Sequence, residues 1–75
     1  SGKSDSKEQL VICENEVEFR DIFNTLESEH PDGCELMAID GSSLGIILKK
    51  AENETRFFMY AAKCDALILC RLAPN

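Results

Sequence analysis

The sequence predicts a small two-layer α+β domain in which two helices pack on an antiparallel sheet, with elements in the order β-α-β-β-α-β. Three observations predict it: short apolar runs rich in β-formers, a capped amphipathic segment, and a turn rich in Asp, Gly and Ser between two apolar runs. The 75 residues, 44% hydrophobic and 29% charged, fit one globular domain. We place it at residues 10–73 and interpret residues 1–9, which carry no apolar side chain, as a linker or tag remnant attached to a domain of a longer protein.

The first half of the chain is expected to form a strand followed by a helix. The run Gln9–Glu14 contains four consecutive β-favouring residues and predicts a central strand. Asn15 can cap a helix, with Glu18 three positions later as in a capping box. One apolar face follows at helical spacing, formed by Phe19, Ile22, Phe23 and Leu26. The tripeptide Pro31-Asp32-Gly33 is expected to end the helix and turn the chain.

Two antiparallel strands are predicted next. The apolar runs Cys34–Ile39 and Leu44–Lys49 flank the tetrapeptide Asp40-Gly41-Ser42-Ser43. A short turn of these residue types between apolar runs is typical of a β-hairpin. We therefore expect these two runs to pair with each other.

The segment after the hairpin allows two interpretations. Asn53 can cap a helix with an ion pair between Glu52 and Arg56, and one face of that helix would carry Phe57, Tyr60, Ala61 and Cys64. Residues 55–62 also alternate as a strand would, which gives the alternative order β-α-β-β-β-β. We expect the helix, followed by a final strand at Ala66–Leu72 that Pro74 closes.

The element order resembles a ferredoxin-like domain of the RNA-recognition-motif type over residues 10–72. In that family one aromatic side chain on the first strand and two on the third stack on bases. Aligning this chain with the two family motifs places Val11, Leu44 and Ile46 at the three stacking positions. The replacements are all aliphatic, so the resemblance implies a sheet face that has lost its stacking groups.

An aliphatic sheet face predicts a protein partner. The expected partner-binding residues are Val11, Leu44, Ile46, Leu67 and Leu69. Such a face is not expected to stand bare in water, so we predict a non-catalytic protein-interaction or dimerisation module. The remaining possibility on this reasoning is that the N-terminal tail or another segment of a longer chain covers the face.

A degenerate nucleic-acid-binding domain is the alternative function. Residues 1–40 carry eleven acids and three bases, whereas residues 41–75 carry three acids and five bases. The five bases of the second half are the candidate contacts, together with Phe58 or Tyr60: Lys49, Lys50, Arg56, Lys63 and Arg71. The acidic first half argues against non-specific phosphate binding, which requires a basic surface.

No enzyme, metal site or cofactor is predicted. His30 is the only histidine, and its acidic and thiol neighbours, Glu29, Asp32, Cys34 and Glu35, fit no metal-ligand spacing. No phosphate loop or nucleophile elbow occurs. The four cysteines form no Cys-x-x-Cys pair and are expected to be reduced. Without an apolar run long enough to span a membrane, we expect a cytoplasmic or nuclear protein.

Overall fold

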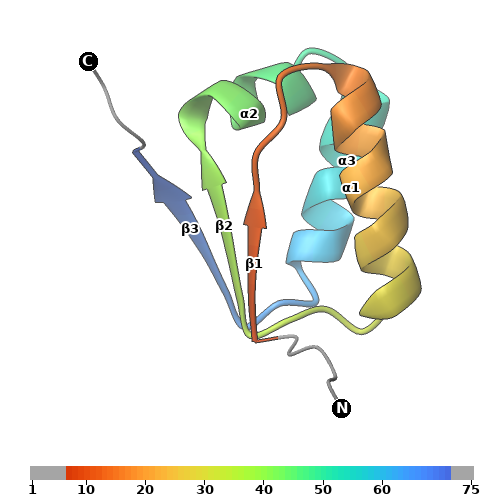
Figure 1. Cartoon of the computed structure of the whole chain (residues 1–75), viewed down its shortest axis with the longest axis vertical. Coiled ribbons are helices and arrows are strands. Elements are labelled where there is room, and N and C mark those ends of the chain that lie inside the picture. The colour runs from red at the N-terminus through yellow and green to blue at the C-terminus, as the bar shows by residue number, and fades with distance from the viewer. Residues whose placement is uncertain (1–6, 72–75) are drawn as a thin grey trace.

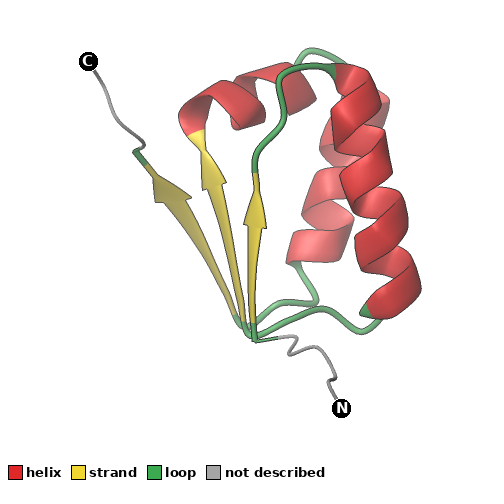
Figure 2. Cartoon of the chain, in the orientation of Figure 1, coloured by secondary structure: helices red, strands yellow, loops and turns green. Residues whose placement is uncertain are grey.

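The computed structural model describes residues 7–71, which form a small α/β fold of three strands and three helices (Figure 1, Figure 2). In chain order the elements are β1 (Glu8–Val11), α1 (Glu16–Glu29), β2 (Leu36–Asp40), α2 (Gly41–Ile47), α3 (Ala51–Ala61) and β3 (Ala66–Cys70). The sheet order is β1-β2-β3, and both strand pairs are parallel. The predicted antiparallel, ferredoxin-like sheet is therefore wrong, and so is the alternative with a strand over residues 55–62.

Helix α1 confirms the local signals before and along it. The Asn15 side chain accepts a hydrogen bond from the Glu18 amide at 2.9 Å, and the Glu18 carboxylate accepts one from the Glu14 amide at 2.8 Å. The predicted apolar face packs into the core, with Phe19, Phe23 and Leu26 buried. The chain turns after the helix at Gly33, whose φ is +97°.

The predicted strand at residues 44–49 is wrong, because most of this run belongs to helix α2. Asp40 caps that helix by accepting a hydrogen bond from the Ser43 amide at 3.1 Å. The Ser43 hydroxyl is buried and serves both backbone groups of Cys13, accepting from its N–H at 2.8 Å and donating to its C=O at 3.2 Å. The same Asp and Ser residues that favour a hairpin turn also favour a helix N-terminus, and here this long-range contact with Cys13 accompanies the helix.

Helix α3 is present as expected, although its start and its ion pair differ from the prediction. It begins after Lys50, and Asn53 lies buried inside it, donating from its amide to Glu16 at 2.9 Å. Arg56 pairs with Glu27 on α1 rather than with Glu52. The predicted apolar face is confirmed for Phe57, Tyr60 and Ala61, whereas Cys64 packs against the core from the loop after the helix.

The ends of the sheet strands differ slightly from the prediction. β1 starts at Glu8, so Glu8 and Gln9 belong to the sheet and not to a linker. β1 also lies at one edge of the sheet, not at its centre. β3 ends at Cys70. Residues 1–6 of the expected linker, and Leu72 and Pro74 at the expected end of the last strand, lie outside the described residues.

All three helices cover the same face of the sheet. Both crossovers run in the same direction along the sheet, and right-handed crossovers of that kind place their helices on one side. The strands and helices accordingly form separate layers (Figure 1). Val11, Met37 and Ile39 face the helices and are at most 1% exposed. The opposite face of the sheet has no helix over it among residues 7–71.

Candidate protein-binding interface

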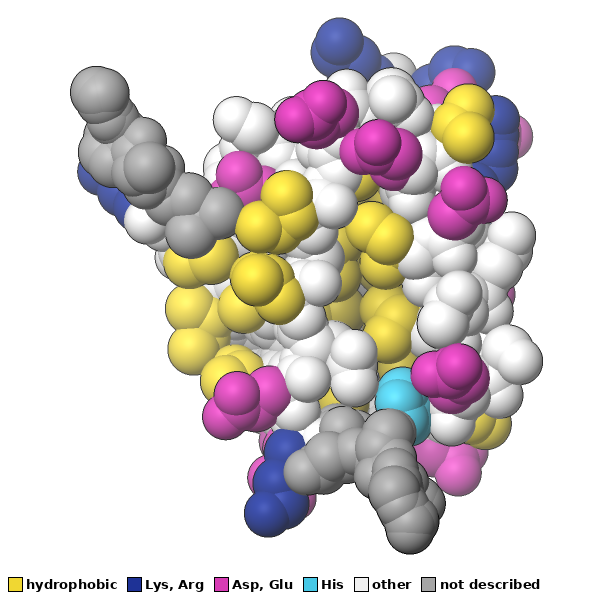
Figure 3. All heavy atoms as spheres, in the orientation of Figure 1, with side chains coloured by type: hydrophobic (Ala, Val, Ile, Leu, Met, Phe, Trp, Pro, Cys, Tyr) yellow, Lys and Arg dark blue, Asp and Glu magenta, His cyan; other side chains and the backbone are white. Residues whose placement is uncertain are grey.

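Strand β3 forms an edge of the sheet and exposes three consecutive large aliphatic side chains. Leu67, Ile68 and Leu69 are 42%, 47% and 60% exposed. Because neighbouring residues of a strand point to opposite faces, both faces of β3 are partly open to solvent. Hydrophobic side chains gather over the strands in the space-filling view (Figure 3). Among residues 7–71 no strand pairs with the outer edge of β3, and an edge strand of this composition is a ready template for pairing with another chain.

The parallel register places these side chains in two groups. Leu67 and Leu69 lie beside Met37 and Ile39, so they share the face that the helices cover. Unlike Met37 and Ile39, however, their side chains remain partly exposed to solvent. Ile68 lies beside Ala38, which in turn lies beside Leu10, so these three share the uncovered face. Leu10 is 58% exposed. The uncovered face and the β3 edge therefore form one continuous aliphatic surface.

The other edge of the sheet is less suited to pairing. β1 contains the charged residue Glu8 and the polar residue Gln9, whereas residues 66–70 of β3 contain no charged or strongly polar side chain. Charged side chains on an edge strand discourage pairing with a further strand. The features that invite a partner thus concentrate on β3.

The sequence-predicted interface residues do not lie together. Val11 shares a sheet face with Leu69 but is fully buried there under the helices, and Leu44 and Ile46 belong to α2, so the prediction that these three form an exposed sheet face with β3 is wrong. Leu67 and Leu69 do lie exposed on β3. Sequence reasoning missed Leu10 and Ile68. The alternation of a strand places Leu10 and Val11 on opposite faces, and likewise Leu67 and Ile68, but it does not say which of the two faces the helices cover.

The five basic residues proposed for nucleic acid are spread over the molecule. Lys49 and Lys50 precede α3 and Lys63 follows it, so they lie at opposite ends of that helix, while Arg71 follows β3. Three of the five have partners: Lys50 pairs with Glu16 at 3.1 Å, Arg56 pairs with Glu27, and Lys63 donates to the Pro31 carbonyl at 3.1 Å. Their charge is therefore partly neutralised and not concentrated on one surface.

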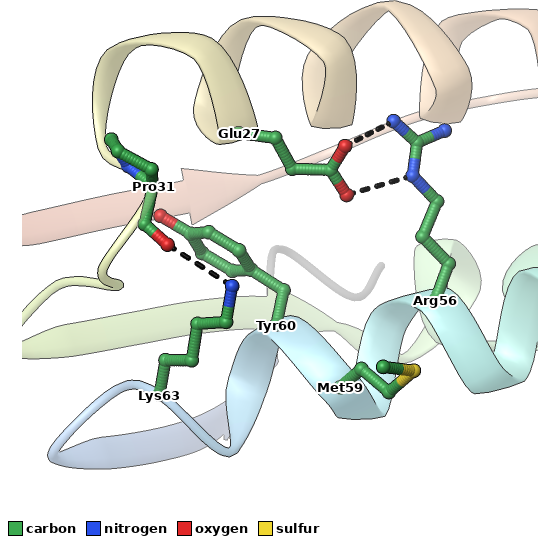
Figure 4. A pocket seen from close by; sticks show the side chains of 6 residues that line it. All are labelled: Glu27, Pro31, Arg56, Met59, Tyr60 and Lys63. Carbon is green, nitrogen blue, oxygen red and sulfur yellow. Dashed lines mark hydrogen bonds and ion pairs between the residues drawn. The ribbon is translucent and has the colours of Figure 1, made fainter.

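A pocket between the end of α1 and α3 is lined in part by polar groups that bond to one another (Figure 4). Arg56 binds both carboxylate oxygens of Glu27, at 2.9 Å from Nε and 2.7 Å from Nη2. The Tyr60 hydroxyl donates to the His30 carbonyl at 2.7 Å, and burial raises the pKa of the Tyr60 phenol to about 12. These groups satisfy one another, so the pocket presents no activated acid, base or nucleophile.

Replacing Arg56 by Met should reduce stability in a pH-dependent way. Hydrogen bonds from Arg56 hold the pKa of Glu27 below its usual value, so the pair stabilises the fold above the unfolded-state pKa of about 4.3 and loses this contribution as the pH falls. Both side chains are partly exposed, so we expect a loss of ~0.5–1 kcal/mol at neutral pH. Urea unfolding at pH 7 and pH 3 measures the difference.

The variant Glu27→Gln is the matched control for this ion pair, because it removes the charge from the other side. It should show a loss of similar size that also shrinks at acidic pH. A loss in Arg56→Met that stays constant between the two pH values would assign the effect to the packing of Arg56 over the rings of Phe19 and Phe23 instead.

The four cysteines are free thiols, and burial raises the pKa of both Cys13 and Cys34. Within residues 7–71 no cluster of His, Cys, Asp and Glu could hold a metal ion. The helices of the same residues are too short or too polar to span a membrane. No metal site is formed in the described part of the chain by His30 and its neighbours Glu29, Asp32, Cys34 and Glu35.

Comparisons with protein families, curated proteins and solved structures give no match.

Proposed function

We propose that the chain is a non-catalytic protein-interaction module that binds its partner through the free edge of β3 and the adjoining aliphatic side chains. The observation that carries the proposal is the uninterrupted apolar strand Ala66–Cys70 at an unpaired sheet edge, with Leu67, Ile68 and Leu69 between 42% and 60% exposed. Main-chain hydrogen bonds to a free edge supply affinity in this mode of recognition, and the exposed side chains supply contact area.

The strength of such binding is set by a few side chains. Covering apolar surface contributes ~25 cal/mol per Å², so burial of three half-exposed aliphatic side chains favours association by several kcal/mol. Part of this gain offsets the cost of restricting the motion of two molecules. The module is therefore expected to bind reversibly, with an affinity that depends strongly on each of Leu67, Ile68 and Leu69.

Position-specific photo-crosslinking in cells tests the proposal. A photoreactive residue at Leu69 should give covalent adducts with protein, because this side chain lies at the edge where the partner strand binds. Val17 on α1 is 61% exposed and serves as the matched control, since it is equally accessible and also apolar but lies away from the sheet edge. We expect at least tenfold more protein adduct at Leu69 than at Val17.

Two outcomes contradict this function. Equal adduct at both positions would show that Leu69 meets other proteins only by collision. Salt-sensitive binding of single-stranded RNA, abolished by replacing Lys49 and Lys63, would favour the nucleic-acid function, because phosphate contacts weaken as salt rises.

A further inference from the structure

We propose that the partner is a second copy of the same chain, joined by antiparallel pairing of the two β3 strands with Ile68 at the centre. This inference rests on the proposed function and names the occupant of its site. A two-fold axis through Ile68 makes each strand the complement of itself, as the contact between two identical subunits requires. The dimer would then hold one continuous sheet with the strand order β1-β2-β3-β3-β2-β1.

The backbone of β3 has the right groups on its free edge for this register. The Ala66 amide donates to the Glu35 carbonyl at 2.9 Å, so the backbone groups of Ala66 point toward the β2 side. Because backbone groups alternate between the two edges of a strand, those of Leu67 and Leu69 point outward. With Ile68 on the axis, Leu67 lies opposite Leu69 of the partner subunit, and the two residues can exchange both of their hydrogen bonds.

Charge complementarity selects this register. Asp65 and Arg71 lie three residues before and three residues after Ile68. Both residues flank β3, so the centred antiparallel register brings Asp65 to the same end of the interface as Arg71 of the partner subunit, and the two-fold axis repeats the pair. Neither side chain takes part in an ion pair within residues 7–71, so both remain available. Directly opposed charges of opposite sign stabilise antiparallel strands, whereas like charges destabilise them.

The apolar side chains also match across the axis. Ile68 would meet Ile68 of the partner subunit on the uncovered face, and directly opposed aliphatic pairs stabilise a sheet. Leu67 and Leu69 would form a four-leucine cluster on the other face. The contact is short and falls below the ~1,200 Å² of a standard interface, so we expect a dissociation constant on the order of 10 μM.

Sedimentation equilibrium of the 75-residue chain over a concentration series tests whether the dimer forms. Reversing the charge of Asp65 or of Arg71 tests the register of the two strands. Asp65→Arg alone opposes two positive charges at each end of the interface, and Arg71→Asp alone opposes two negative charges. Each should weaken association roughly tenfold, as expected for two partly exposed ion pairs replaced by repulsion. An equimolar mixture of the two variants restores opposite charges at both ends and should associate as tightly as the unaltered chain.

Substitutions on the uncovered face supply the matched control. Ile68→Lys places two ammonium groups at the axis and should abolish the dimer without unfolding the domain, because Ile68 is half exposed. Leu10→Lys lies on the same face but on β1 and should leave the dimer intact. Loss of association in both variants, or no rescue in the mixture of charge variants, would overturn the β3 register. A chain that stays monomeric at 100 μM while Leu69 still crosslinks to a different protein would overturn self-pairing but retain the proposed function.

A different observation, the juxtaposition of Cys34 and Cys64, carries a second inference. Their Sγ atoms are 3.3 Å apart, and a disulfide requires about 2.05 Å, so a small movement closes the bond. The loops that hold them are already joined, since the Asp65 amide donates to the Cys34 carbonyl at 3.1 Å. We infer that this pair is oxidised by a low-molecular-weight disulfide such as glutathione disulfide to a covalent link between the loops before β2 and β3.

The oxidation follows thiol–disulfide exchange. The thiolate of Cys64, the more exposed of the two, attacks glutathione disulfide and releases one glutathione, which leaves a mixed disulfide on Cys64. The Cys34 thiol then loses its proton and attacks Sγ of Cys64, releasing the second glutathione. Two thiols are oxidised and one glutathione disulfide is reduced to two glutathiones. Burial raises the pKa of Cys34 to about 12, so the second step is slow at neutral pH and faster in alkali.

Incubation of the folded chain with glutathione disulfide, followed by peptide mass mapping, tests the inference. The expected product lacks two hydrogen atoms, links Cys34 to Cys64, and unfolds at a temperature higher by roughly 10 °C, because the bond closes a long loop. Cys64→Ser should form no intramolecular disulfide and show no shift. A lasting glutathione adduct on Cys64, or a link that uses Cys13 or Cys70 instead, would overturn the inference.

Discussion

Replacing Phe23 by Ala should remove most of the stability of the domain. Phe23 is fully buried, and its ring lies 4.7 Å from that of Phe19, 6.0 Å from that of Phe57 and 5.7 Å from that of Tyr60, measured between ring centres. It contacts one ring on its own helix α1 and two rings on α3, so it joins the two long helices in the core. Truncating a buried Phe costs ~3–5 kcal/mol, because the transfer energy is lost and a cavity remains.

The size of this loss matters because the domain is small. Proteins retain ~0.05–0.15 kcal/mol of stability per residue, so a chain of this length is expected to have about 4–11 kcal/mol in total. Phe23→Ala should therefore shift the urea midpoint strongly downward or leave the chain unfolded without denaturant. Circular dichroism at 222 nm during urea titration measures the midpoint.

Phe58→Ala is the control, because this side chain has the same size and is also on a helix. Its ring is 46% exposed and packs edge-on against Phe57 at 5.0 Å. Its removal should cost about 1 kcal/mol or less. A comparable loss in both variants would show that the ring cluster around Phe23 does not dominate the core.

The sequence predicts these helices well because their signals are local. Asn15, Glu18 and the spacing of Phe19, Phe23 and Leu26 act within a few turns of the same helix. Phe57 and Tyr60 provide the same periodic signal in α3. A capping bond or an apolar face at helical spacing needs no knowledge of the rest of the fold.

Strand pairing could not be predicted in the same way. The run after Asp40 is short and apolar, and such a run fits a buried helix as well as a strand. Its helical form is accompanied by a contact that the local sequence does not reveal, because the Ser43 hydroxyl bonds to the backbone of Cys13 thirty positions earlier. Once that run is a helix, β2 and β3 are no longer joined by a tight hairpin turn, and the longer connection allows the parallel pairing that the structure shows.

The candidate interface was predictable only in part for a related reason. The apolar composition of residues 66–70 indicates a strand with apolar side chains on both faces, and Leu67 and Leu69 are indeed exposed. Which face of β1 meets the helices depends on the register with β2. That register buries Val11 and exposes Leu10, and four consecutive apolar residues cannot reveal the choice.

Replacing Gly33 by Ala should also destabilise the fold strongly, because two separate constraints exclude a side chain at this position. The φ of Gly33 is +97°, a conformation that residues with a Cβ rarely adopt. An added Cβ would lie 2.4 Å from the carbonyl oxygen of Lys63 and 2.6 Å from its carbonyl carbon. These are backbone atoms of the loop before β3, so the clash is relieved only by separating the two loops. We expect a loss of ~2–4 kcal/mol in urea unfolding, the sum of backbone strain and overpacking.

Gly45→Ala is the matched control and should act in the opposite direction. Gly45 lies within α2, and an added Cβ there meets no atom within 4 Å. Alanine in a helix interior is favoured over glycine by ~0.5–1 kcal/mol, so this variant should be more stable than the unaltered chain. If Gly45→Ala stabilises the fold and Gly33→Ala destabilises it, the loss at Gly33 is due to the close contact between the loops and not to the loss of a glycine as such.

The Gly33 variant should also slow formation of the Cys34–Cys64 disulfide, whereas Gly45→Ala should not. The reason is that Gly33 precedes Cys34 and contacts Lys63, which precedes Cys64. Equal disulfide rates in the two variants would show that the approach of the loops at Gly33 does not position the thiols.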